Sequence, residues 1–202
     1  LADKGEEINC LILGEGLTSR YGLNNNIDKD ITLLHKNSLK ASKIIGFKKV
    51  VFGGYPDNRL DLVNRLEIIK FIENQINLFK PNVIYTHHGS DRNYDHRITS
   101  DSVLTAARPF SKTFVKKIIA FETPSSTEWS FDNSISKFNP NIFVDVSSTI
   151  DFKLEAMKFY ESELREYPHP RSIESLKVIS KRWGTVVGVD YAEAFQLVWE
   201  IN

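Results

Sequence analysis

The sequence lacks several features that mark whole classes of protein. It has a single cysteine, Cys10, among 202 residues, so no internal disulfide can form, and a lone thiol inside an apolar run suits a reducing compartment. No apolar run approaches the roughly 20 residues that span a bilayer. The 26 basic residues are balanced by 26 acidic ones, which leaves no excess charge for nucleic acid or an anionic membrane. We therefore expect a cytoplasmic protein that binds no nucleic acid.

The sequence does contain enough hydrophobic residues for the core of one large α/β domain. Hydrophobic residues make up 41% of the chain, which supports a substantial core at this length. Apolar runs typical of strands alternate with amphipathic stretches of helical period. We expect strands at 8–13, 48–54, 82–85, 115–121 and 141–146, and helices at 31–46, 62–79, 98–108, 150–165 and 172–183; segment 191–199 fits either. This alternation predicts a mostly parallel sheet with helices on both faces, formed by residues 1–202 as a single domain.

The opening residues have the pattern of a helix end. Leu1 to Lys4 precede Gly5, which fits a glycine cap after the last helical turn. Four residues cannot make a stable helix on their own, so we interpret them as the end of a helix that starts upstream. An α/β fold would place a strand before that helix. We therefore expect the sequence to begin inside the first βα unit of its domain, with the first strand missing.

Titratable side chains gather directly after the expected strand at 82–85. Three of the five histidines and two aspartates fall within Thr86-His87-His88-Gly89-Ser90-Asp91-Arg92-Asn93-Tyr94-Asp95-His96-Arg97. Open α/β sheets bind ligands at the carboxyl ends of their strands, and imidazole and carboxylate both suit zinc. His96 is a candidate ligand with Asp95 as its orienting neighbour. The spacing equally allows Asp95 to cap a helix and His87 and His88 to form a polar strand end.

Other expected loops also follow strands and carry polar side chains. Glu15 and Arg20 lie in a loop with two glycines, Arg59 follows the strand at 48–54, and the hydroxyl-rich stretch after residue 121 holds Glu122 and Trp129. Turns, solvated loops and a local ion pair of the Arg59 guanidinium are the plain alternatives. Guanidinium groups bind anionic or hydroxyl-rich ligands. We expect Arg59, Glu122 and Trp129 to line a sugar-binding site.

Thr86–Arg97 closely resembles the second motif of the LmbE-like, or PIG-L, zinc-dependent de-N-acetylases. Further blocks look like a bacterial branch of the same family in the same order: Gly14–Tyr21, Pro56–Asp61, Phe121–Trp129 and Pro168–Ser172. The resemblance implies a Rossmann-like three-layer α/β/α fold and hydrolysis of an acetamide on an amino sugar or a related glycan precursor. The family's first motif, His-Pro-Asp-Asp, supplies two zinc ligands and the catalytic base, and it is absent from these 202 residues.

Carried over residue by residue, the resemblance makes His96 a ligand of zinc, with another divalent metal as the alternative, and Asp95 its orienting neighbour. In some relatives a histidine three positions before the metal ligand stabilises the oxyanion; Asn93 holds that position here, and His88 is our alternative for the role. Because the first motif is absent, we expect the 202 residues by themselves to lack hydrolase activity. The expected partner is an N-acetylated sugar or glycan precursor, and we allow for a homo-oligomer. The other reading is a non-catalytic sugar-binding or regulatory protein on the same scaffold.

Overall fold

The computed structural model describes residues 1–16, 27–109, 114–132 and 134–201. The chain forms two compact units, one from Leu1–Asp57 with Asp145–Glu193 and the other from Asn58–Val144 with Ala194–Asn202. Both units combine helices with strands, and parallel strand pairs occur in each. The expected α/β class is therefore confirmed. That the 202 residues make a single domain stays a prediction.

The first unit is built around two parallel strands. Strand β1 (Asn9–Gly14) pairs with β2 (Lys49–Tyr55). Helix α2 (Ile27–Ile45) packs against β2 and against α5 (Ile150–Lys158), and α6 (Ile173–Val187) packs against α5. The buried side chains at the centre of the last helix pair are aliphatic: Ile150, Leu154 and Leu176.

The first residues form the short turn that the sequence predicts. Ala2–Lys4 is a 3-10 helix, η1, and Gly5 follows it with φ 78° and donates its backbone N–H to the carbonyl of Ala2. The left-handed conformation costs glycine little because it has no Cβ. The expected glycine cap is confirmed.

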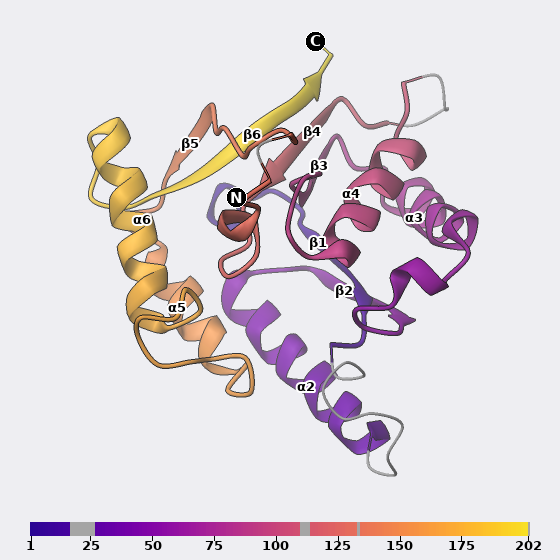
Figure 1. Ribbon diagram of the computed structural model, residues 1–202, viewed down its shortest axis with the longest axis horizontal. Helices are drawn as coiled ribbons and strands as arrows, with labels where there is room; N and C mark the ends of the chain where they lie inside the picture. The colour runs from indigo at the N-terminus through magenta and orange to yellow at the C-terminus, as the bar shows by residue number, and fades with distance from the viewer. Residues whose placement is uncertain (17–26, 110–113, 133, 202) are drawn as a thin grey trace. The chain divides into compact units, whose positions relative to one another are not determined.

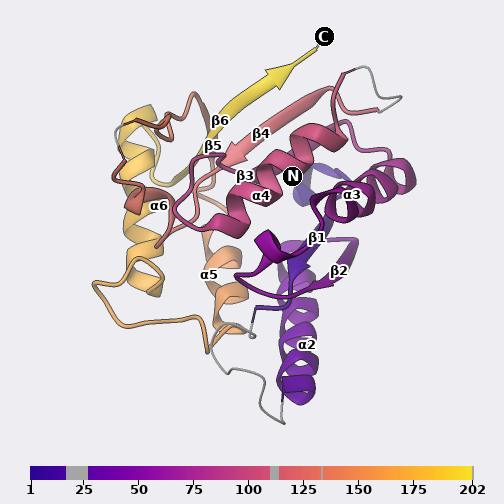
Figure 2. The same cartoon turned by 45° about the vertical axis from the view of Figure 1, so that its right-hand side comes forward.

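The second unit contains a four-stranded sheet in the order β3-β4-β6-β5 (Figures 1 and 2). β3 and β4 run parallel, whereas β6 is antiparallel to β4. Helix α4 packs on β3, on α3 and on the short helix η2. The bounds of these elements are β3 Val83–His87, β4 Lys117–Phe121, β5 Ile142–Asp145, β6 Ala192–Glu200, α3 Arg65–Phe79, α4 Tyr94–Ala106, η2 Leu60–Leu62 and η3 Thr127–Trp129. Segment 191–199, which fitted a helix or a strand, thus forms a strand.

Two helices end where the sequence did not predict. Helix α5 stops at Lys158 instead of residue 165, because the backbone N–H groups of Phe159 and Tyr160 turn back to the carbonyls three residues earlier, those of Ala156 and Met157. Helix α6 continues past residue 183, its expected end, and through Gly184, and it is capped by Gly188 with φ 78°. A Cβ on Gly184 would lie 2.4 Å from the carbonyl oxygen of Val189. Gly184 therefore allows the chain to return close to the helix and does not cap it.

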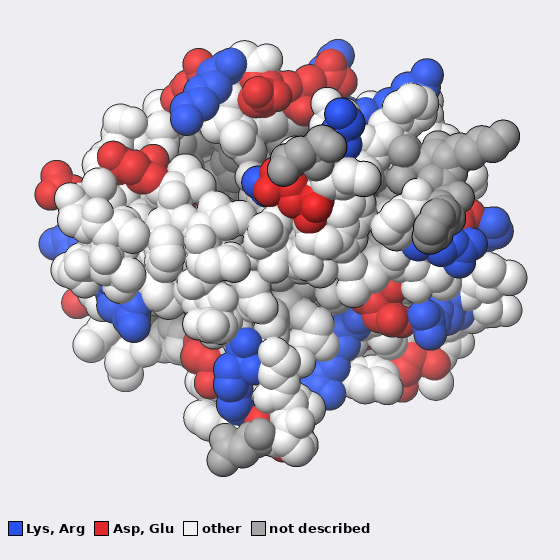
Figure 3. All heavy atoms as spheres, turned by 90° about the horizontal axis from the view of Figure 1, so that it is seen from above, with Lys and Arg blue, Asp and Glu red and all other residues white. Residues whose placement is uncertain are grey.

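Two observations concern the helices and the charged side chains on one face. Within the described ranges, no helix has the length and apolar character needed to cross a membrane. On the face drawn in Figure 3, acidic and basic side chains are interspersed.

Candidate active site

His96 lies in the first turn of α4 and faces the carboxylate of Asp91. Its Nδ1 is 3.0 Å from Oδ1 of Asp91, whose side chain has 0% exposure, while the His96 side chain is 20% exposed. The contact is close but poorly aligned, since Nδ1 has no partner with hydrogen-bond geometry in the described part of the chain. With Nδ1 turned toward a carboxylate, Nε2 is the nitrogen left to bind a ligand.

The Asp91 carboxylate is surrounded by hydrogen-bond donors. The backbone N–H of Asn93 donates to Oδ1 at 2.8 Å, the hydroxyl of Ser126 also donates to Oδ1, and the hydroxyl of Thr127 donates to Oδ2 at 2.6 Å. Burial raises the pKa of Asp91, but the contact with His96 and these three hydrogen bonds outweigh burial and lower it to about 2. Asp91 is therefore a buried anion at neutral pH.

Asn93 fixes the start of the helix that carries His96. Its Oδ1 accepts hydrogen bonds from the backbone N–H groups of Asp95 at 2.8 Å and His96 at 3.4 Å, which is the usual action of an N-cap residue. Its Nδ2 donates to Oδ1 of Asn58 at 3.2 Å. This cap explains why α4 begins at Tyr94 and not at residue 98 as expected. Asn93 thus links the loop before α4 to the loop that contains Asn58, and it fixes the direction of the first turn of α4.

His87 lies flat against His96. The ring centroids are 4.0 Å apart with an interplanar angle of 2°, and Nδ1 of His87 is 3.3 Å from the hydroxyl of Thr123. Burial, reinforced by the neighbouring His96, lowers the pKa of His87 to about 3 against the opposing effect of Asp91. A neutral His87 can pack on His96 without charge repulsion.

Asp95, which we expected to orient His96, is buried, and its Oδ1 accepts a hydrogen bond from the backbone N–H of Leu60 at 3.1 Å. This bond ties the start of α4 to η2. The carboxylate shown in contact with Nδ1 of His96 is that of Asp91. A role of Asp95 in orienting His96 stays a prediction.

His88, one of the two residues expected to stabilise an oxyanion, is held by its own loop. Its Nδ1 accepts a hydrogen bond from the backbone N–H of Ser90 at 3.3 Å, and its ring meets Phe138 edge to face at 5.6 Å. Burial lowers the pKa of His88, although Asp91 and a hydrogen bond with Gln196 oppose that effect. Its catalytic role stays a prediction.

The three expected sugar-binding residues occupy separate positions in the second unit. Arg59 is exposed before η2, Glu122 is half-buried after β4, and Trp129 is 42% exposed at the end of η3. Trp129 lines an open hollow of about 540 Å³ together with Arg92, Phe131 and Asp132. Arg20, named as a further candidate, lies outside the described residues.

Sequence reasoning missed the residues that hold His96 in place. The sequence places Asp91 in the histidine-rich stretch without indicating a role for it, and it places Ser126 and Thr127 in the hydroxyl-rich stretch after residue 121. Their hydroxyls instead bind Asp91 across more than 30 positions of sequence. The signal available was chemical: a carboxylate five residues before a candidate metal ligand, and a loop with paired hydroxyls.

The described residues do not by themselves form a metal site. No group of three or more His, Cys, Asp or Glu side chains among them is arranged to hold a metal ion. His96 offers one imidazole nitrogen whose partner nitrogen faces a buried carboxylate, which is the usual outer support of a metal-ligating histidine.

The α/β fold matches that of LmbE-like deacetylase structures. The chain belongs to the PIG-L family: the sequence profile described as PIG-L, GlcNAc-PI de-N-acetylase, matches residues 1–107. The chain is 29% identical over 169 residues to the uncharacterized deacetylase YaiS of Escherichia coli K12, covering 80% of this chain and 79% of that protein. The expected family is thereby confirmed.

Solved structures share the fold at low sequence identity. One is the N,N'-diacetylchitobiose deacetylase of Pyrococcus horikoshii, with a TM-score of 0.75 and 19% identity over 98% of this chain and 75% of that chain. Another is GalB of Pseudomonas putida, a 4-carboxy-2-hydroxymuconate hydratase, with a TM-score of 0.73 and 19% identity over 100% of this chain and 88% of that chain. Proteins with this fold therefore catalyse more than one reaction, and the function of this chain must be inferred from its site residues.

Proposed function

We propose that the full-length protein is a zinc-dependent hydrolase that removes the acetyl group from an N-acetylated amino sugar or a glycan precursor. The observation that carries the proposal is the position of His96, whose Nδ1 faces the buried anion Asp91 at 3.0 Å. Family membership and a sugar deacetylase among the structures of the same fold support it. Its cytoplasmic location and self-association into a homo-oligomer remain expectations from the sequence.

The donor chemistry at His96 fits a zinc ion. Imidazole nitrogen is a preferred zinc ligand, and a carboxylate on the second ring nitrogen fixes the tautomer and strengthens the ligand. When bound, zinc would polarise the acetamide carbonyl and lower the pKa of water. The family motif that supplies the other ligands and the base does not occur in these 202 residues, so we assign no described residue to those roles.

The reaction needs groups that hold the acetamide while its C–N bond breaks. Water adds to the carbonyl carbon, acetate leaves, and the amine takes up a proton. The side-chain amide of Asn93 has two N–H donors, one of which is used by Asn58, and we propose that the other donates to the developing oxyanion. His88 is the second candidate for this role. Arg59, Glu122 and Trp129 would contact the sugar.

The test is metal content and acetate release from N-acetyl sugars by the full-length protein. We expect His96→Ala to lose both, because it removes the nitrogen that would bind the ion. His35→Ala is the matched control, since His35 stacks on Phe52 in the first unit and should leave both unchanged. Retention of metal and of acetate release by His96→Ala would refute the assignment.

The same assay separates the enzyme from a non-catalytic sugar-binding protein. A binding protein would bind N-acetyl sugars without releasing acetate, and His96→Ala would not change its affinity for them. The buried charge of Asp91 favours the enzyme. A negative charge taken out of water needs a compensating positive charge nearby, and a cation bound to His96 would supply one.

A further inference from the structure

We propose that Glu128 is a positioning residue of the candidate active site. Through the backbone of its own loop it aims two hydroxyl groups at the carboxylate of Asp91, and so it keeps Asp91 against His96. The consequence for zinc binding rests on the proposed function, whereas the geometry of the Asp91–His96 pair can be tested without it.

Glu128 is exposed in η3, yet its carboxylate is directed back onto the chain. Oε1 accepts a hydrogen bond from the backbone N–H of Ser125 at 2.6 Å, and Oε2 accepts one from the backbone N–H of Ser126 at 3.1 Å. Hydrogen bonds to a carboxylate are stronger than those between neutral groups. The two oxygens of one side chain therefore hold two consecutive peptide groups.

The backbone at Ser125 needs such support. Its φ is 69°, in the left-handed region that residues with a Cβ adopt rarely. Conformations of this kind persist where the surrounding contacts hold them in place. Because φ of Ser125 sets the direction in which the chain continues to Ser126, a return of Ser125 to negative φ would redirect the side chains that follow it. The hydrogen bonds to Glu128 oppose that return.

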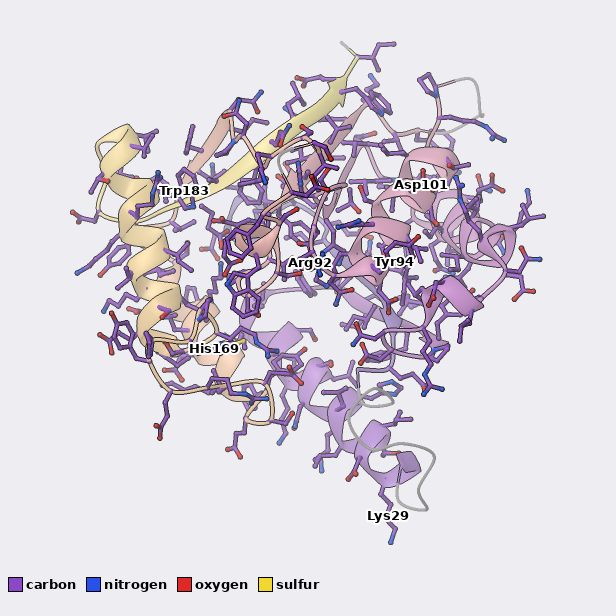
Figure 4. All side chains as sticks on the ribbon, in the orientation of Figure 1. Lys29, Arg92, Tyr94, Asp101, His169 and Trp183 are labelled. Atoms are coloured by element: carbon purple, nitrogen blue, oxygen red, sulfur yellow. The ribbon has the colours of Figure 1, made fainter. Side chains whose placement is uncertain are left out.

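The two residues after this turn bind Asp91. The hydroxyl of Ser126 donates to Oδ1 of Asp91, and the hydroxyl of Thr127 donates to Oδ2 at 2.6 Å. One hydroxyl on each oxygen fixes the plane of the carboxylate. Asp91 directly precedes Arg92, which Figure 4 labels where the chain approaches α4. The turn after β4 thus sets the orientation of a carboxylate on the loop before α4.

The orientation of Asp91 matters because its Oδ1 lies 3.0 Å from Nδ1 of His96. The same turn also reaches the ring that stacks on His96. The backbone N–H of Thr123 donates to the hydroxyl of Thr127 at 2.7 Å, and the Thr123 hydroxyl is 3.3 Å from Nδ1 of His87. A displaced turn would disturb both supports of the His96 ring. The carboxylate that holds the turn would therefore act on His96 without touching it.

The direct readout is the proton NMR signal of the His96 ring N–H in the full-length protein, identified by its loss in His96→Ala. We expect Glu128→Ala to shift or broaden this signal, because the carboxylate that faces the N–H is no longer held in one orientation. A contribution of Glu128 to loop stability alone would leave the ring signal in place. An unchanged ring signal would overturn the proposal.

Zinc affinity, measured by competition with a chromophoric chelator, is the second readout. We expect Glu128→Ala to lower it about three- to tenfold, less than the roughly ten- to a hundredfold that is usual for the direct partner of a metal-binding histidine. An unchanged affinity in a protein that binds zinc would also overturn the proposal.

Substitution of Ser125 tests the route from Glu128 to His96. Glycine adopts the left-handed region without the penalty of a Cβ, so adding Ser125→Gly to Glu128→Ala should return both readouts toward their wild-type values. Glu128→Gln, whose amide keeps one acceptor oxygen, should fall between wild type and Glu128→Ala. Readouts of the double variant equal to those of Glu128→Ala would refute a route through the turn at Ser125.

Asp145→Asn is the matched control. The exposed carboxylate of Asp145 likewise holds its own turn, accepting from the backbone N–H of Ser147 at 2.9 Å and from the Ser147 hydroxyl at 2.6 Å, but it belongs to the first unit. Both readouts should stay at their wild-type values. A shift of the His96 signal as large as that in Glu128→Ala would refute a specific role for Glu128.

The result for Glu128 and the result for the proposed function can be told apart. A wild-type protein that binds no zinc and releases no acetate would refute the proposed function, while the ring signal would still decide the role of Glu128. Zinc binding and acetate release by the wild type, with a His96 signal that Glu128→Ala leaves unchanged, would refute the positioning role and leave the proposed function standing.

Discussion

Nδ1 of His96 and Oδ1 of Asp91 are 3.0 Å apart, and the aspartate has no exposed surface. This contact leaves Nε2 of His96 available to bind a ligand, because the nitrogen that faces an anion carries the proton. It also lowers the pKa of Asp91, so the buried carboxylate stays charged. The two residues act as one unit, and changing either should alter the other's chemistry.

Asp91→Asn keeps the shape of the side chain but removes its charge. We expect the zinc affinity of the full-length protein to fall about ten- to a hundredfold, as is usual when the outer partner of a metal-binding histidine is lost. Competition with a chromophoric chelator measures it. Asp101→Asn is the control, because Asp101 lies on the same helix, pairs with Arg65 and is 57% exposed. Equal affinity in wild type and Asp91→Asn would contradict the pairing.

Asn93 has a structural role shown by the structure and a catalytic role that we predict, and two substitutions separate them. Asn93→Ala should lower the free energy of unfolding by about 1 kcal/mol through loss of the helix cap. Asn93→Asp keeps an oxygen for the cap but has no N–H donor, so stability should hold while acetate release falls. Urea unfolding and an acetate assay measure the two effects.

The control for Asn93 is Asn64→Ala, because Asn64 caps α3 by accepting from the backbone N–H of Leu66. It should cost a similar amount of stability and leave acetate release unchanged. If Asn93→Asp released acetate at the wild-type rate, Asn93 would be a cap and nothing more.

Cys10 should react slowly until the solution is strongly alkaline. Burial raises the pKa of its thiol from 9.0 to about 11, and the thiolate is the reactive form. Alkylation by iodoacetamide in the folded protein should therefore accelerate up to about pH 11, whereas in denaturant it should level off near pH 9. Because the unfolded chain releases this proton first, the free energy of unfolding should fall between those two pH values. Mass spectrometry follows the modification, and a plateau near pH 9 in folded protein would rule out the shift.

Gly184→Ala should destabilise the protein by about 1–3 kcal/mol, the usual cost of overpacking. The new Cβ would lie 2.4 Å from the carbonyl oxygen of Val189 and 2.8 Å from that of Asp190, so the returning chain would have to move. Thr185→Ala, an exposed neighbour on the same helix, should stay within about 0.5 kcal/mol. Urea unfolding of the two variants measures the difference. Equal stability would show that the backbone at Val189 and Asp190 can move away from the new Cβ at little cost in free energy.

The sequence predicted the elements of the fold better than their ends. Strands such as Val83–His87 and the amphipathic helix Arg65–Phe79 were found from their periodicity, because burial of one face imposes a repeat. The ends depend on single contacts. The cap made by Asn93 started α4 early, and the close return of the chain over Gly184 carried α6 past its expected end.

The candidate site was predicted in part. The run of histidines and aspartates located the loop, and the family resemblance singled out His96. Asp91 could not be assigned in the same way, because its hydrogen bonds come from Ser126 and Thr127, far away in the sequence. Pairings of that kind depend on tertiary structure, which one sequence does not display.

The parallel stacking of His87 on His96 has a consequence for how an ion is captured. A ring held flat at 4.0 Å by its neighbour cannot turn freely about its side-chain torsions. The conformational freedom that a mobile imidazole would surrender on coordination has already been given up when the chain folds. The site should therefore capture its ion with little rearrangement.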